Sequence, residues 1–186
     1  RRAARWVNTL MISLIGGLSF VLLSYLVVRG ESYVYMMGHF PAPWGNEIRA
    51  GILEAGTALF FCVIMLLSML GGRKKLQEEV VESKHNMYYI LVNLLLSSLL
   101  ALVYTNDLFT AYVFVEINTI AACGLIMIRQ NGRTIEAAVR YMIMSLLGSG
   151  LLLLGICMLY DLTGHLLMSN IQEAVQGILE DGTYEV

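Results

Sequence analysis

Apolar residues in this chain occur in long runs that short polar stretches separate. Five of the runs are long enough to cross a lipid bilayer, which takes about 20 residues of helix. They cover residues 7–28, 50–70, 87–104, 108–128 and 137–160. This pattern predicts an all-α fold, a polytopic membrane helix bundle of about five transmembrane helices, in a single membrane domain over residues 1–186.

The stretch between the first two runs reads Gly-His-Phe-Pro-Ala-Pro-Trp-Gly at residues 38–45. Its prolines and glycines stop helices, and its aromatic residues suit the membrane interface. We therefore expect an irregular loop there that anchors the chain at the interface.

Residues 170–180 follow the fifth run, after Gly164 has ended its helix. They have an amphipathic pattern, and Asn170 and Glu173 have the spacing of a capping box. The apolar stripe consists of Ile171, Val175, Ile178 and Leu179. We expect a short amphipathic helix on the membrane surface, although the same pattern also suits the lead-in to a further span.

The composition agrees with a membrane protein. Hydrophobic residues make up 58% of the chain and charged residues 14%, and the mean hydropathy is +0.69. A soluble domain is typically about half apolar and about a quarter charged. Lysine and arginine occur in short clusters between apolar runs, which gives no basic face of the kind that binds nucleic acid.

The placement of positive charge predicts an orientation in the cell membrane. If the five runs alternate in direction, three basic groups fall on one side of the bilayer: Arg1, Arg2 and Arg5; Arg73, Lys74, Lys75 and Lys84; and Arg129, Arg133 and Arg140. The other side carries Glu31, Glu47, Asp107, Asp161 and the acidic tail, with Arg29 and Arg49 as exceptions. Because cytoplasmic loops are rich in lysine and arginine, we expect a cytoplasmic N-terminus.

Glu116 is the residue that most invites a function. The fourth run starts near Leu108, so Glu116 lies roughly 12 Å deep in a hydrocarbon core about 30 Å thick. An ionised acid at that depth costs at least a few kcal/mol, so it must be protonated, paired with a cation, or next to water. Tyr112, Thr119 and Cys123 share its helix face. A proton or ion relay is the favoured interpretation, and a static hydrogen bond between helices is the alternative.

Two further residues are candidates for the same site. Asp107, at the outer end of the fourth run, suits either a helix cap, shared with Asn106, or an ion-access role. Arg140, about one turn inside the fifth run, suits either an anchor that reaches the basic side or a charge partner near a proton path. The three cysteines and three histidines have no metal-ligand spacing, so we expect neither a metal nor a cofactor.

Three stretches resemble the antiporter-like membrane subunits. NDLFTAYVFVE at residues 106–116 resembles the family signature GDLFNLFVFFE. The stretch 38–45 is similar to its GNWPAPFG loop, and residues 137–164 are similar to its LKYLL…LYxxTG helix. This family includes the D-type subunits of Mrp cation/proton antiporters, the ion-pumping subunits of respiratory complex I, and their counterparts in membrane-bound hydrogenases. Thr110 and Arg140 depart from the pattern, which usually has Asn and Lys there.

The resemblance covers residues 5–178 and implies the N-terminal portion of such a subunit. An Arg at position 1 also suggests that a segment precedes this sequence. In the family, the glutamate of the signature, here Glu116, is the buried acid of a proton path. Its usual partner is a lysine on a later, broken helix, which these residues do not include.

The resemblance thus implies a non-redox subunit of a larger membrane complex that translocates protons, with sodium as a second candidate ion. A structural membrane scaffold without ion transport of its own is the alternative hypothesis.

Overall fold

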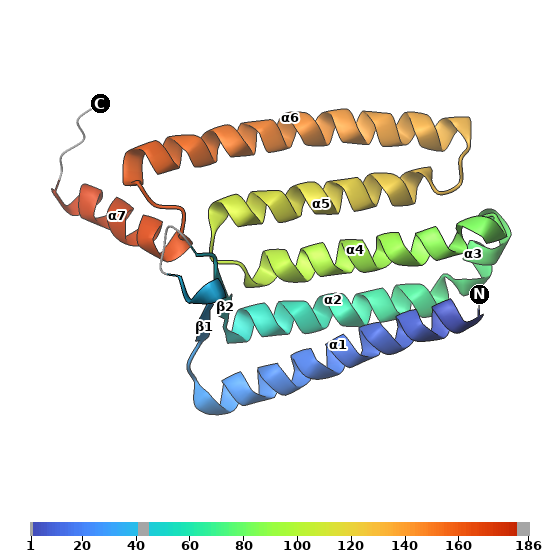
Figure 1. The fold of residues 1–186 in the computed structure, drawn as a ribbon, viewed down its shortest axis with the longest axis horizontal. Coiled ribbons are helices and arrows are strands. Elements are labelled where there is room, and N and C mark those ends of the chain that lie inside the picture. The colour runs from blue at the N-terminus through green and yellow to red at the C-terminus, as the bar shows by residue number, and fades with distance from the viewer. Residues whose placement is uncertain (1, 41–44, 182–186) are drawn as a thin grey trace.

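The computed structural model describes residues 2–40 and 45–181, which form a row of long helices (Figure 1). The elements are α1 (Arg2–Arg29), β1 (Tyr33–Met36), β2 (Glu47–Ala50), α2 (Ile52–Gly71), α3 (Arg73–Glu79), α4 (His85–Tyr104), α5 (Leu108–Met127), α6 (Gly132–Thr163) and α7 (Met168–Asp181). Single 3-10 turns lie at Met37–His39 and Glu82–Lys84. Helices α1, α2, α4, α5 and α6 are long and apolar enough to cross a membrane. The predicted fold class is therefore confirmed.

Helix α6 is longer than the apolar run that led to its prediction. It begins at Gly132, five residues before the predicted start at 137, and continues to Thr163. A capping box formed by Asn131 and Thr134 defines its start, because each side chain bonds the backbone of the other residue. Gly164, with φ of 69°, ends the helix in the left-handed conformation. The hydropathy pattern missed the first turns because they carry Arg133 and Glu136.

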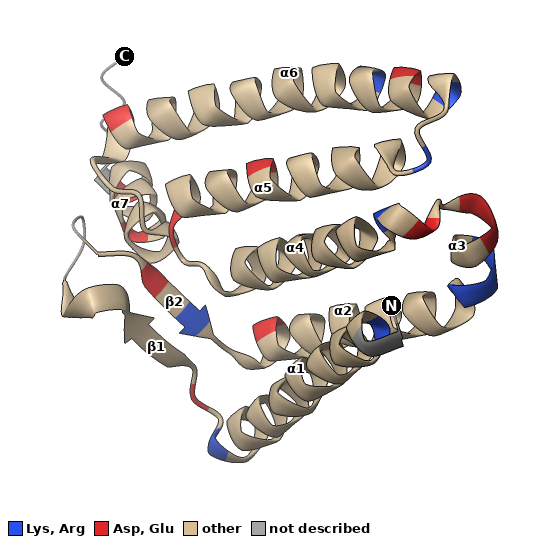
Figure 2. Cartoon of the chain, turned by 45° about the vertical axis from the view of Figure 1, so that its right-hand side comes forward, with Lys and Arg blue, Asp and Glu red and all other residues tan. Residues whose placement is uncertain are grey.

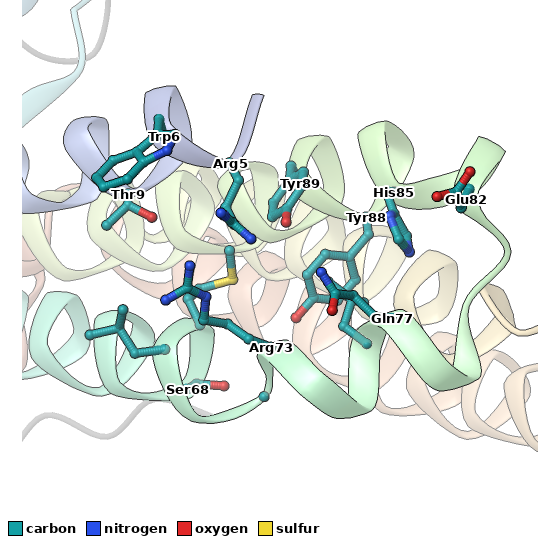
Figure 3. Close-up of a pocket in the computed structure, with 14 residues that line it drawn as sticks. Arg5, Trp6, Thr9, Ser68, Arg73, Gln77, Glu82, His85, Tyr88 and Tyr89 are labelled. Carbon is teal, nitrogen blue, oxygen red and sulfur yellow. The ribbon is translucent and has the colours of Figure 1, made fainter. Parts of the chain in front are cut away.

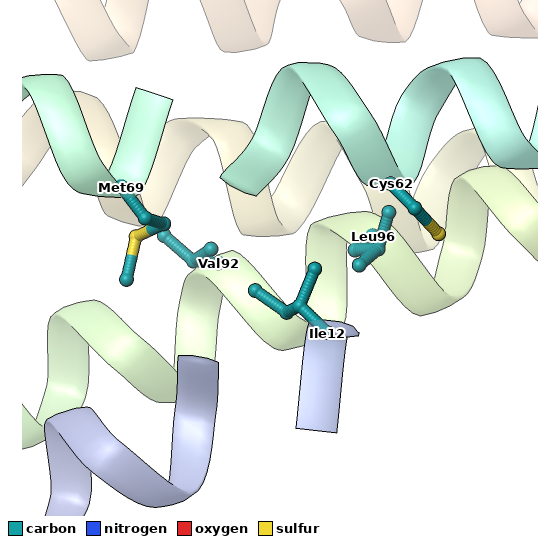
Figure 4. Packing of buried hydrophobic residues seen from close by; sticks show 5 residues of the cluster. All are labelled: Ile12, Cys62, Met69, Val92 and Leu96. Atoms are coloured by element: carbon teal, nitrogen blue, oxygen red, sulfur yellow. The ribbon is translucent and has the colours of Figure 1, made fainter. Parts of the chain in front are cut away.

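Helices α1, α2 and α4 share the main apolar core. Its buried residues are Ile12, Cys62, Met69, Val92 and Leu96 (Figure 4). Ala55, Ala58, Cys62 and Met69 form the buried stripe of α2. A Cβ at Gly16 of α1 would lie 3.4 Å from the Cys62 Cβ, so small residues let these two helices approach closely.

A β-hairpin interrupts the helical pattern between α1 and α2, and the sequence did not predict it. Strands β1 and β2 are antiparallel, with Tyr33 opposite Ala50 and Met36 opposite Glu47. Ala50, the predicted start of the second span, therefore ends a strand. Of the predicted interfacial loop at 38–45, residues 41–44 lie outside the described residues.

The hairpin meets the α4–α5 connection, which in turn meets the α6–α7 connection. We call these three segments together the outer junction. Ile48 of β2 pairs with Thr105, and Asp107 pairs with Leu167, so three chain segments lie edge to edge. Asn106 lies at the centre and is only 6% exposed. Its side-chain amide donates to Glu47 Oε1 at 2.7 Å and to Ser169 Oγ at 3.2 Å. The outer junction thereby fixes the N-terminal ends of α2, α5 and α7 relative to one another.

The predicted capping box of the last helix is wrong. Helix α7 begins at Met168, and the backbone N–H of Ile171 donates to the carbonyl of Leu167. Asn170 is therefore inside the first turn rather than at the cap. The junction around Leu167 determines where α7 starts, and that contact comes from residues far away in the sequence.

Most lysines and arginines lie at one end of the row, together with acids on α3 and α6, whereas Arg29 and Arg49 lie at the other end (Figure 2). We call the end that holds the N-terminus, α3 and the α5–α6 connection the basic end. The opposite end carries the outer junction with Glu47 and Asp107. Figure 2 also shows one acidic position in the middle of α5, which is Glu116.

Candidate functional site

Glu116 lies on the third turn of α5 and is the one charged residue in Leu108–Met127. Apolar residues before and after it make α5 a candidate membrane span. Because α5 begins at Leu108, Glu116 lies roughly 12 Å along the helix from its start. No other span of the described chain places an acid so far from its ends.

One carboxylate oxygen of Glu116 is buried without a partner. Within the part of the chain that the structure describes, Oε1 is shielded from solvent and has no hydrogen-bond donor. An ionised oxygen in such a place loses its hydration and gains nothing in return, which costs several kcal/mol. The geometry therefore suits an oxygen that meets a donor, a cation or a water from a neighbouring element.

The face of α5 that carries Glu116 packs against α6. Thr119 and Cys123, on the same face, are 9% and 5% exposed. The Cys123 thiol donates to the carbonyl of Ala138 in α6 at 3.8 Å. The two helices run antiparallel. Glu116 is seven residues before Cys123 and Ser145 is seven residues after Ala138, so Glu116 and Ser145 lie at about the same level along the two helices. This hydroxyl went unnoticed in the sequence because it is a single small polar residue in an apolar run.

The other polar contact of α5 lies on a different face. Ser98 of α4, which is 3% exposed, donates to Asn118 Oδ1 at 3.4 Å. Asn118 is two residues after Glu116, which is a rotation of roughly 200° around the helix. The Ser98 contact thus lies between α4 and α5, on a different face of α5 from Glu116.

Asp107 caps α5. Its carboxylate accepts a hydrogen bond from the backbone N–H of Thr110 at 2.6 Å, which satisfies one of the free donors of the first turn. Asn106, the other suggested cap, bonds Glu47 and Ser169 instead. The ion-access role of Asp107 stays a prediction.

Loss of this cap is expected to reduce stability. We expect Asp107→Ala to lower the free energy of unfolding in detergent by about 1 kcal/mol, and Asp107→Asn to lower it much less, because Asn also caps helices. Asp161→Ala, at an exposed acid near the same end, is the matched control. Equal losses in Asp107→Ala and Asp107→Asn would show that the charge matters rather than the cap.

Arg140 finds its partner on its own helix. Its guanidinium pairs with Glu136 one turn earlier at 2.5 Å, and both side chains are largely exposed, at 78% and 63%. By the register given above, Arg140 lies about five residues, or ~7.5 Å, closer to the basic end than Ser145 does. The structure thus does not bring Arg140 to Glu116, and its role in a proton path stays a prediction.

In the described ranges, no three histidine, cysteine or acidic residues lie close enough together to hold a metal ion. The three cysteines are free thiols.

The fold and Glu116 define a class of protein: a polytopic helical membrane protein with a carboxyl group inside a candidate span, one oxygen of which is shielded from solvent. Residues 105–184 match the family described as NADH:quinone oxidoreductase/Mrp antiporter, TM. This match includes α5 with Glu116, α6 and α7. The resemblance to antiporter-like membrane subunits is therefore confirmed.

Relatives agree with that resemblance, and a solved structure shares the fold. The chain is 34% identical over 151 residues to NADH-quinone oxidoreductase subunit N of Desulforudis audaxviator, across 81% of this chain and 30% of that one. It is 28% identical over 140 residues to the D-type subunit of a probable K(+)/H(+) antiporter of Rhizobium meliloti, across 75% and 25%. A chain of the archaeal membrane-bound sulfane sulfur reductase shares the fold, with a TM-score of 0.81 at 24% identity, across 90% and 34%. The chain thus spans about a third or less of the length of the proteins it matches.

Proposed function

We propose that this chain is part of a proton-translocating membrane subunit, in an Mrp-type antiporter or in a complex related to complex I or to membrane-bound hydrogenases. Glu116 is its proton relay. The observation that carries the proposal is the buried, unpartnered Oε1 of Glu116 near the middle of α5. The family match over residues 105–184 supports it, because this segment contains Glu116.

The proposed mechanism is an electrostatic switch at one carboxyl group. When a cationic side chain approaches from a neighbouring helix, ionised Glu116 is stabilised and releases its proton. When the cation withdraws, burial favours the neutral acid, and Glu116 takes up a proton again. The family resemblance suggests a lysine as that cation.

An orientation and a set of partners belong to the same proposal. Because cytoplasmic loops are enriched in lysine and arginine, the basic end faces the cytoplasm and the outer junction faces the opposite side. The partners are other membrane subunits, since the relatives named above are subunits of complexes. The transported ion is the proton. If transport is coupled to sodium as well, a sodium gradient imposed in the transport assay will change the rate of proton uptake.

Transport and assembly, measured together, test the proposal. Glu116→Gln and Glu116→Ala are introduced into the protein in its native membrane, and both proton uptake into inverted vesicles and recovery of the assembled complex are measured. We expect assembly without transport in the Gln variant. Normal transport in both variants would exclude the relay, and failed assembly even with glutamine would favour the structural scaffold.

Arg140 provides a second, weaker prediction. Exposed ion pairs contribute about 1 kcal/mol or less, so we expect Arg140→Gln to slow proton transport by no more than about fivefold. Glu136→Gln, which breaks the same pair from the other side, is expected to have an effect of similar size. A much larger loss in Arg140→Gln alone, with Glu136→Gln near normal, would instead assign Arg140 to the proton path.

A further inference from the structure

A cavity of about 560 Å³ lies at the basic end, between the N-terminal part of α1, the end of α2, α3 and the start of α4 (Figure 3). It is distinct from the Glu116 site, because none of its lining residues comes from α5 or α6. The polar and aromatic side chains that decide its chemistry are Arg5, Arg73, Thr9, Ser68, Tyr88 and Tyr89.

Two arginines from different helices reach into this cavity. Figure 3 shows the guanidinium groups of Arg5, on α1, and Arg73, at the start of α3, pointing toward the same space. In the part of the chain that the structure describes, neither guanidinium has a carboxylate partner among the ion pairs. Glu82 also lines the cavity but takes part in an interaction of its own. Two like charges on one cavity repel each other unless an anion lies between them.

The remaining walls suit an anion with polar oxygens. Thr9 and Ser68 contribute hydroxyl groups. Tyr88 and Tyr89 contribute phenols, whose ring centroids lie 5.6 Å apart in an edge-to-face arrangement. Hydroxyl and guanidinium donors together are the groups that bind phosphate oxygens, and arginine binds them in a bidentate manner.

The surroundings of the cavity indicate a lipid rather than a free ion. Trp6 and Leu70 also line it and are 67% and 51% exposed, so apolar surface continues from the cavity to the outside of the bundle. Trp6 is an aromatic residue at the end of a candidate span, the position where such rings meet the headgroup region. Basic pockets between transmembrane helices are typical sites for anionic headgroups.

We propose that this cavity binds the phosphate headgroup of an anionic phospholipid, with its acyl chains lying along the outer surface of α1 and α2. Arg5 and Arg73 hold the phosphate, and the hydroxyl groups of Thr9 and Ser68 donate to its oxygens. The site joins α1, α2, α3 and α4 at the basic end, so a bound lipid stabilises their packing. This proposal does not depend on proton transport through Glu116.

Native mass spectrometry of the purified protein with dioctanoyl lipids tests the proposal. We expect phosphatidylglycerol to bind about tenfold more tightly than phosphatidylcholine of the same chain length, since each basic residue near an anionic headgroup strengthens binding several-fold. Arg5→Gln/Arg73→Gln is expected to remove this preference. Lys74→Gln/Lys75→Gln removes the same charge from exposed positions of α3 that do not line the cavity, and it is expected to keep the preference.

Two further variants keep the test decisive. Arg5→Lys/Arg73→Lys retains both charges and is expected to retain most of the preference, and Arg73→Gln alone, at an exposed position, is expected to remove part of it. An equal loss in the Lys74/Lys75 and Arg5/Arg73 glutamine variants would overturn the site in favour of general surface charge. Inorganic phosphate that binds as tightly as the lipid would overturn the lipid assignment.

Discussion

Replacing Glu116 with glutamine is expected to reduce proton transport at least about 100-fold, because a positioned group that transfers a proton contributes on this scale. Glutamine has nearly the same shape as glutamic acid and keeps an oxygen and a polar nitrogen at the same place on α5. It cannot bind and release a proton. Stability should change little, because the variant removes no hydrogen bond of the buried Oε1, which has none in the described structure.

The matched control is Glu136→Gln, which removes an exposed carboxylate from the adjacent helix. We expect it to transport protons within about fivefold of the unaltered protein. Glu116→Asp retains the acid on a shorter side chain and should restore part of the rate. Proton uptake is measured in inverted vesicles with equal amounts of assembled complex, and a Gln variant that transports at the normal rate would refute the relay.

The sequence predicted the helices that lie in lipid because their signal is local. A run of about 20 apolar residues has no stable place in water, whatever surrounds it. Polar first turns carry no such signal, so the start of α6 at Gly132 was missed. Its capping box, Asn131 with Thr134, was visible in the sequence and would have located it.

The hairpin and the outer junction could not be predicted in the same way. Strand β2 pairs with β1 on one side and meets Thr105 on the other, so its structure depends on a residue more than fifty positions away. A four-residue strand is too short for its alternation to be distinguished from a loop. The start of α7 depends on the same junction, which explains why local capping spacing gave the wrong position.

The candidate site was predictable in its central residue but not in its surroundings. A single carboxylate in an apolar run is visible in any sequence, and its cost in lipid makes it a candidate for function. Which helix Glu116 faces depends on packing, here the contact of Cys123 with Ala138 of α6. Arg140 was a reasonable partner by composition, yet the i, i+4 spacing gives it Glu136.

The second large effect is expected at Asn106, the centre of the outer junction. We expect Asn106→Ala to lower the free energy of unfolding by about 2 kcal/mol, because hydrogen bonds to charged groups contribute about 1.5–3 kcal/mol. The substitution removes the donor of both the 2.7 Å bond to Glu47 and the 3.2 Å bond to Ser169. The backbone bonds of Asn106 to Glu47 and Met168 are retained, so the fold should persist with a loosened junction.

Two readouts separate this local effect from a general one. Unfolding in detergent measures the loss of stability, and amide hydrogen exchange should show faster exchange in β2 and in the first turn of α7, with α1 unchanged. Asn86→Ala, at an exposed position on the first turn of α4, controls for the loss of an amide and should stay within about 0.5 kcal/mol of the unaltered protein. Glu47→Gln retains an acceptor for the Asn106 amide but removes the charge, so its loss should fall between these two. If Asn106→Ala unfolds like Asn86→Ala, the three segments are held by their backbone pairing alone, and the Asn106 side chain contributes nothing measurable to the junction.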